Sequence, residues 1–183
     1  MSRNQWLLLI AATLASYGVG QVWLVQLSSY RLWAYVGVSE FQAYHQAWWR
    51  SIWWVVLLPA GLVFAASILM LWMRPAGVPV WAVRLGFGLE FLLALGTAVW
   101  WGPLMARLAS PETGLIQPLY RQLMVTHWMR VGLVTAYGLL VGLDADALHA
   151  CSGLRAESNS IESPTIQTAA TRVSVMISPP QAK

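Results

Sequence analysis

Four long runs of apolar residues alternate with shorter polar or proline-containing segments along most of the chain. The runs cover about residues 6–27, 52–73, 80–101 and 119–143. A hydrocarbon core of about 30 Å needs roughly 20 apolar residues in a helix, so each run is long enough to cross a bilayer. Because the runs are continuously apolar and do not alternate with period two, they predict membrane-spanning helices rather than barrel strands.

The segments between the runs predict short turns and one long connection. The sequence RPAGVP at 74–79 predicts a turn between the second and third spans, and Trp-Gly-Pro at 101–103 ends the third span. The first connection, 28–51, contains FQAYHQAWWR. Its mixture of aromatic and polar residues favours a helix that either lies at the membrane interface or extends the second span.

Tryptophans gather near the ends of the predicted spans. Their side chains prefer the boundary between lipid and water, so they predict an aromatic belt at each membrane face. The belt residues are expected to be Trp23, Trp33, Trp48, Trp49, Trp53, Trp54, Trp100 and Trp101 on one face, and Trp6, Trp72 and Trp81 on the other.

The chain changes character after Leu143. From Asp144 onward it is rich in Ser, Thr and Pro and has no sustained apolar period, which predicts a disordered tail. We therefore expect an all-α fold with two parts. Residues 1–143 form an integral membrane four-helix bundle, and residues 144–183 form a polar, disordered C-terminal tail.

Composition supports a membrane protein and excludes other classes. Of the 183 residues, 58% are hydrophobic and only 10% are charged, which is too apolar for an ordinary soluble domain. The net charge of +4 comes mainly from scattered arginines without a basic stripe, so no nucleic-acid partner is expected. A single cysteine excludes an internal disulfide. The arginines are shared nearly equally between the two membrane sides, so the charge rule selects no orientation.

Two opposite charges lie deep inside the predicted spans. Glu90 is about 11 residues from the Trp101 end of the third span, and Arg130 is about 11 residues into the fourth span from the same membrane face. At ~1.5 Å per residue, both lie roughly 16 Å deep. An unpaired charge at this depth costs at least about 2.5 to 3.5 kcal/mol, so we expect a Glu90–Arg130 pair inside the bundle. Such a pair fits a structural role as well as a functional one.

Other polar residues follow the same helix faces. His127 precedes Arg130 by three residues and shares its face. In the first span, Tyr17 and Gln21 continue a polar stripe at helical spacing, so three spans present polar faces that can converge. His127 also fits a simple hydrogen bond to Gln21 or to a tyrosine. His45 is a further candidate for substrate contact, although its shallow position equally suits a hydrated interfacial histidine.

Metal and cofactor chemistry has little support in the sequence. His45, His127 and Glu90 have the residue types of a two-histidine, one-carboxylate iron centre, but they come from distant segments without local ligand spacing. A haem or metal carrier is therefore kept as an alternative function, while no bound metal and no cofactor is expected. Phosphate-binding loops, nucleophile elbows and CxxC pairs are also absent from the sequence.

Residues 100–143, WWGPLMARLASPETGLIQPLYRQLMVTHWMRVGLVTAYGLLVGL, carry a resemblance to a known family. The Pro103–Leu108 segment that closes the third span, and the HWMRV sequence with Trp128 and Arg130, resemble the four-helix membrane family that includes the anthrone oxygenases and many bacterial relatives. The likeness extends over about residues 5–143. It implies a lipid-embedded pocket, a multi-pass protein of the bacterial inner membrane and, in characterised members, oxidation of an aromatic anthrone to a quinone without a tightly bound cofactor.

These observations lead to a main functional hypothesis and a non-catalytic alternative. In an oxygenase-like site for a hydrophobic aromatic substrate, His127 would accept the substrate proton, since histidine titrates near pH ~6.5. Arg130 would stabilise the enolate and Glu90 would orient Arg130. Tyr17 or Gln21 would donate a hydrogen bond to a substrate oxygen. Alternatively, the bundle is an accessory or assembly subunit that binds a larger membrane complex through its tryptophan-rich face.

Overall fold

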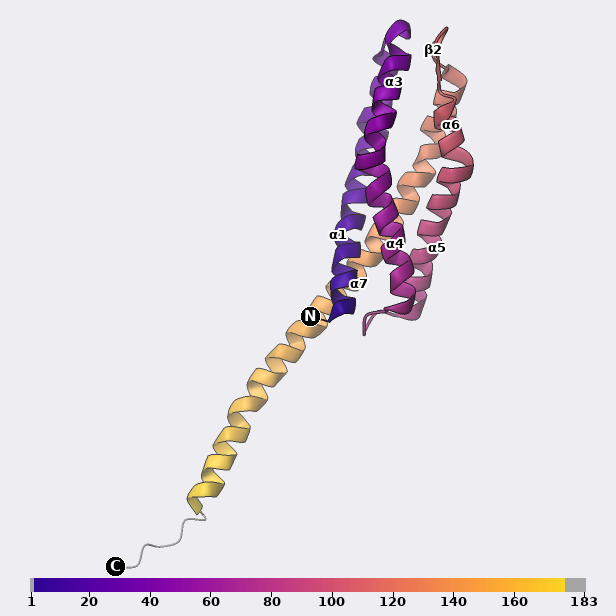
Figure 1. Cartoon of the computed structure of the whole chain (residues 1–183). Helices are drawn as coiled ribbons and strands as arrows, with labels where there is room; N and C mark the ends of the chain where they lie inside the picture. The colour runs from indigo at the N-terminus through magenta and orange to yellow at the C-terminus, as the bar shows by residue number, and fades with distance from the viewer. Residues whose placement is uncertain (1, 177–183) are drawn as a thin grey trace, which may run out of the picture. The chain divides into compact units, whose positions relative to one another are not determined.

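The computed structural model describes the backbone of residues 2–176 and the side chains of residues 2–146. The chain divides into two compact units, Met1–Ala145 and Asp146–Lys183. The first unit is a bundle of four long helices, each long and apolar enough to cross a membrane (Figure 1). These candidate spans are Arg3–Tyr35, Val38–Trp72, Val80–Ala106 and Gln117–Asp146. The structure thus confirms the all-α four-helix bundle of a multi-pass membrane protein.

Each of the first three helices is built from several consecutive elements. The first comprises α1 (Arg3–Leu24), η1 (Val25–Ser29), α2 (Tyr30–Leu32) and η2 (Trp33–Tyr35). The second comprises α3 (Val38–Ile52), η3 (Trp53–Leu57) and α4 (Leu58–Trp72). The third comprises α5 (Val80–Gly96), η4 (Thr97–Trp101) and α6 (Gly102–Ala106). Strands β1 (Ala109–Ser110) and β2 (Gly114–Leu115) then lead into α7 (Gln117–Met176).

The first connection is helical almost throughout. The first helix continues to Tyr35, and α3 starts at Val38 and runs on into the second span. Of the two predictions for residues 28–51, extension of the second span is therefore the one that the structure shows. The turn predicted at 74–79 is present, and Gly77 has a φ of 97° there, a backbone conformation that glycine adopts without strain.

A small antiparallel hairpin between the third and fourth spans was not predicted from the sequence. Strands β1 and β2 pair Ala109 with Leu115 and Ser110 with Gly114. Gly114 has a φ of 64°, and a Cβ atom there would lie 2.9 Å from the Cα atom of Val38. Only glycine satisfies both conditions, so this residue allows the hairpin to pack against the start of α3.

Three of the four spans contain a π-helical turn, and proline accounts for two of these turns. The amide of Leu58 bonds to the Trp53 carbonyl and closes η3, and Pro59 follows at once. The amide of Gly102 bonds to the Thr97 carbonyl and closes η4, and Pro103 follows in the same way. In a regular α-helix a proline ring clashes with the carbonyl four residues earlier, and a wider π turn relieves this clash.

The carbonyl group of Val55, four residues before Pro59, accepts a hydrogen bond from another span. Proline has no N–H, so the carbonyl of Val55 cannot receive the usual bond from residue 59. The Tyr17 hydroxyl donates a hydrogen bond of 2.9 Å to this carbonyl oxygen. The proline break in the second span is thus tied to α1.

The predicted aromatic belt at the first face is only partly present. Trp53, Trp54 and Trp100 are exposed, as belt residues should be. Trp33 and Trp101 are instead buried and belong to a core cluster, against which Trp48 and Trp49 pack. The prediction was wrong for these four residues because each indole finds aromatic or aliphatic partners inside the bundle. The other members of the cluster are Tyr30, Phe41, Leu104, Met105, Leu108 and Leu123.

The last helix runs further than the predicted span. The sequence favours an irregular tail from Asp144, whereas the backbone of α7 is helical as far as Met176. No proline occurs between Leu143 and Pro164, so nothing in the intervening sequence forces the helix to end. The predicted disorder of residues 177–183 lies outside the described residues.

Candidate functional site

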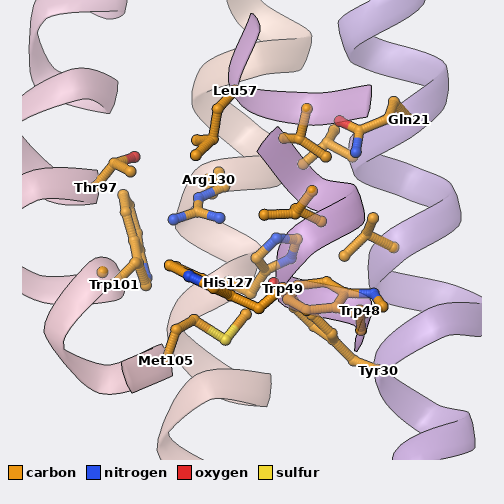
Figure 2. A pocket seen from close by; sticks show the side chains of 15 residues that line it. Gln21, Tyr30, Trp48, Trp49, Leu57, Thr97, Trp101, Met105, His127 and Arg130 are labelled. Atoms are coloured by element: carbon orange, nitrogen blue, oxygen red, sulfur yellow. The ribbon is translucent and has the colours of Figure 1, made fainter. Parts of the chain in front are cut away.

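Two cavities lie between the helices of the bundle, are partly open at its surface and share part of their lining. The smaller has a volume of about 60 Å³ and is lined by aromatic side chains together with His127 and Arg130 (Figure 2). The larger has a volume of about 340 Å³ and is lined mainly by apolar side chains together with Glu90 and Tyr137. Arg130, Gln21 and Thr97 line both cavities. Arg130 therefore lies where the two spaces adjoin.

All three π-helical turns border the smaller cavity. Val25 comes from η1, Leu57 from η3, and Thr97 and Trp101 from η4. A π turn widens the helix and changes the direction of the side chains that follow it, and such turns occur frequently at functional sites. The irregularities at Pro59 and Pro103 thus border the cavity that contains His127 and Arg130.

Arg130 has no anionic partner in the described part of the protein. Its guanidinium carbon lies 4.5 Å from the centre of the Trp101 ring, a cation–π contact. Its Nε atom is buried without a hydrogen-bond acceptor. Among residues 2–146, no carboxylate lies within the 4.0 Å that defines an ion pair with this group. Arg130 is therefore a desolvated cation covered by an aromatic ring.

The expected direct Glu90–Arg130 pair was wrong, and helix direction explains why. Helical side chains tilt toward the N-terminus of their own helix. Because α5 and α7 run in opposite directions (Figure 1), the two side chains tilt apart, and Thr97, seven residues after Glu90, is the residue of the third span that borders the smaller cavity beside Arg130. Arg130 extends toward Trp101, while Glu90 enters the larger cavity. The role of Glu90 as an orienting partner of Arg130 therefore has no direct contact to support it.

His127 is buried and held by a chain of hydrogen bonds. Its Nδ1 atom lies 2.8 Å from the Oε1 atom of Gln26, and the Gln26 amide nitrogen donates to the Met124 carbonyl at 3.4 Å. A carbonyl can only accept, so the Gln26 nitrogen faces Met124 and its oxygen faces the imidazole. Nδ1 must then carry the proton and donate it to Gln26. The Nε2 atom of the neutral ring is left as an acceptor, the state that a general base requires.

Aromatic side chains enclose His127 and Arg130. The Tyr30 ring meets the His127 ring edge to face, with centroids 4.8 Å apart. Figure 2 shows Trp101 on one side of Arg130, and Trp48, Trp49 and Tyr30 grouped around His127. Such a lining excludes water and strengthens electrostatic interactions with anything bound there.

The structure brings most of the predicted site residues to the two cavities, but their contacts differ from the predicted ones. Gln21 lines both cavities, and Glu90 lines the larger one. Tyr17 also lines the larger cavity, although its hydroxyl proton is committed to Val55. His45 lines neither cavity and packs between aromatic rings, with the Trp33 centroid 5.5 Å away. His45 is therefore separate from the other candidates.

The iron-type ligand set is not assembled. His127 lines the smaller cavity, Glu90 lines the larger one, and His45 packs against Trp33 outside both cavities. Among the described residues, no group of three or more His, Cys, Asp or Glu side chains could hold a metal ion.

Sequence reasoning missed Gln26, Tyr30 and Trp101. Gln21 and Gln26 are five residues apart, and at about 100° per residue they would face different sides of a regular α-helix. Gln26 instead shares the inward face of Val22, which is buried four residues earlier and lines both cavities, and it lies within η1, the π turn closed by the Tyr30 amide and the Val25 carbonyl. No local sequence pattern predicts η1, because no proline follows it as Pro59 and Pro103 follow the other two π turns. Trp101 had been assigned to the belt, and its contact with Arg130 depends on tertiary packing.

Comparison with family models, curated proteins and solved structures finds no match to this chain. The fold and the cavities therefore define the class: a four-helix membrane protein with a buried, cationic and aromatic polar site.

Proposed function

We propose that this protein is a membrane-embedded enzyme that binds a hydrophobic aromatic molecule through an acidic oxygen and removes a proton from it. The proposal depends mainly on Arg130, a guanidinium between the helices that has a buried Nε atom and a cation–π contact but no carboxylate partner among the described side chains. An unpaired charge within lipid is costly, so a site of this kind favours an anionic ligand group.

The larger cavity supports the choice of substrate class. Its volume of about 340 Å³ lies within the usual range for small-molecule pockets, and most of its lining is apolar. A flat aromatic molecule that enters from the bilayer would place its rings in this space and its acidic oxygen at Arg130. The tryptophans beside the smaller cavity offer further surfaces for ring contacts.

His127 is the base in this proposal. Its Nε2 atom is available because Gln26 holds the proton on Nδ1. Removal of a proton from an anthrone-type substrate leaves an enolate, whose oxygen the Arg130 guanidinium would stabilise. In the reaction of the family that this chain resembles, dioxygen then supplies one atom for the new carbonyl, and the other atom leaves as water with the two hydrogens of the oxidised carbon.

The inward direction of the polar side chains favours this reading over an accessory subunit. An assembly subunit that used polar contacts with its partner would present its polar stripes outside the bundle. Glu90 and His127 are instead buried, with 4% and 1% of their surface exposed, and both line cavities between the helices. The exposed tryptophans are accounted for by contact with lipid.

Oxygen uptake by the protein in lipid nanodiscs tests the proposal. Anthrone is added, oxygen consumption and quinone absorbance are recorded, and the rate in empty nanodiscs is subtracted. Arg130→Met and His127→Asn should each lower the rate by about 100-fold or more, the range for loss of a general base or an oxyanion partner. Arg84→Met is the matched control, because Arg84 is exposed and lines neither cavity.

The outcomes separate binding from chemistry. Quenching of tryptophan emission by anthraquinone reports binding without turnover. Binding that requires Arg130, with no oxygen uptake above background, would overturn the oxygenase reaction and leave a binding site. Failure to bind or oxidise the aromatic compounds, or equal activity of Arg130→Met and the wild type, would overturn the proposal as a whole.

A further inference from the structure

The larger cavity has two polar ends. One is the cationic pole at Arg130, and the other, formed by Glu90 and Tyr137, is a second pole that the proposed reaction does not use. Glu90 is 4% exposed, and no hydrogen bond or ion pair to its carboxyl group is found among the side chains and backbone of residues 2–146. Tyr137 is 1% exposed, and its hydroxyl is buried without a partner. Both residues line the same cavity. Groups of this kind at the centre of a membrane span require a partner, which a ligand can supply.

The two poles are separated along the bundle axis. Arg130 and Tyr137 are one heptad apart on α7, and Glu90 and Thr97 are one heptad apart along α5 and η4. At ~1.5 Å per residue, each pair spans roughly 10 Å. Thr97 borders the smaller cavity beside Arg130, so the Glu90–Tyr137 pole lies about two helical turns from the cationic pole.

The chemistry of the poles is complementary to different groups. The cationic pole favours an oxyanion. A carboxyl group and a phenol hydroxyl favour a hydrogen-bond donor, because both oxygens can accept. A purely apolar end would leave both buried groups without a partner.

We infer that the site takes an elongated aromatic molecule with a polar group at each end: an acidic oxygen at Arg130 and His127, and a hydroxyl group at Glu90 and Tyr137. This inference rests on the proposed function, since it names the substrate class of the same site. The apolar middle of the cavity holds the rings, and the two poles fix the direction in which the molecule enters.

Two fluorescent probes test this arrangement in nanodiscs. The probe 2-hydroxyanthracene has one hydroxyl, and 2,6-dihydroxyanthracene has one at each end of the same ring system. Binding is followed by energy transfer from protein tryptophans, after subtraction of the signal from empty nanodiscs. The wild type should bind the dihydroxy probe about tenfold more tightly, the usual effect of one hydrogen bond to a buried polar group.

Substitutions at the second pole should remove the preference for the dihydroxy probe without changing the binding of the monohydroxy probe. Glu90→Leu should weaken the dihydroxy probe about tenfold and leave the monohydroxy probe unchanged, and Tyr137→Phe should act in the same direction. Glu90→Gln keeps an acceptor oxygen and should retain part of the preference. It therefore tests the role of Glu90 even if the Glu90→Leu variant does not fold. Ser67→Ala is the matched control, because Ser67 is equally buried but lines neither cavity.

The results distinguish this inference from the proposed function. Equal affinity for the two probes in the wild type, or a preference that survives both Glu90→Leu and Tyr137→Phe, would overturn the second pole alone. If Arg130→Met leaves the binding of both probes unchanged, or if neither probe binds, both the proposed function and the second pole are overturned.

Discussion

Replacement of Tyr17 by phenylalanine tests how the proline break is accommodated. The Tyr17 hydroxyl donates a 2.9 Å hydrogen bond to the Val55 carbonyl, which cannot receive the usual α-helical bond because residue 59 is proline. Tyr17→Phe removes this donor and preserves the ring that lines the larger cavity. The carbonyl would then lose this partner in a segment where lipid offers no replacement.

The expected loss of stability follows from the worth of one hydrogen bond. Such bonds contribute about 0.5 to 1.5 kcal/mol in proteins, and interhelical bonds in membranes average about 0.6 kcal/mol. Because residue 59 cannot donate to this acceptor, we expect the upper part of this range, about 1 kcal/mol. In a Pro59→Ala background the alanine amide can bond to the Val55 carbonyl, so the same substitution should cost only a few tenths of a kcal/mol.

The measurement is a double-mutant cycle of unfolding. The four proteins, in mixed detergent micelles, are titrated with SDS, and tryptophan emission reports the unfolded fraction. The coupling free energy between the two positions should be about 0.7 kcal/mol or more, above the ~0.3 to 0.5 kcal/mol expected for independent sites. Tyr35→Phe serves as a control, because Tyr35 is 85% exposed. An equal cost of Tyr17→Phe in both backgrounds would refute this account of the proline break.

Two further predictions concern the histidine and the packing of α7. Gln26→Leu removes the acceptor for the Nδ1 proton of His127. It should lower stability by about 1 to 3 kcal/mol and abolish the preference for the Nδ1–H tautomer in ¹⁵N spectra of the imidazole. An unchanged tautomer would contradict the role given to Gln26. Gly138→Ala places a Cβ atom 2.6 Å from the Cγ2 atom of Val19 and should cost about 1 to 3 kcal/mol in the SDS titration. A Cβ atom on Gly132 meets nothing within 4 Å, so Gly132→Ala should be neutral or slightly stabilising. Equal effects of Gly138→Ala and Gly132→Ala on stability would argue against the packing of α1 on α7.

The architecture of the bundle was available from local sequence patterns. Continuous apolar runs of sufficient length predicted all four spans, because lipid requires each segment to satisfy its own backbone. The turn at 74–79 followed from its proline and glycine residues. The shared helix face of His127 and Arg130 followed from their spacing, and both residues line the smaller cavity. These features depend on neighbours within a few residues, so a single sequence contains them.

The arrangement of the site was decided by tertiary structure. Depth alone suggested that Glu90 and Arg130 pair, but opposite helix directions turn their side chains apart, and Trp101 covers the cation instead. Gln26 meets His127, which lies 101 residues later in the chain, and no pattern within one helix specifies this contact. Helical periodicity specifies which residues share a face of one helix. The direction of each side chain and the partner that it meets depend on packing between segments far apart in the chain.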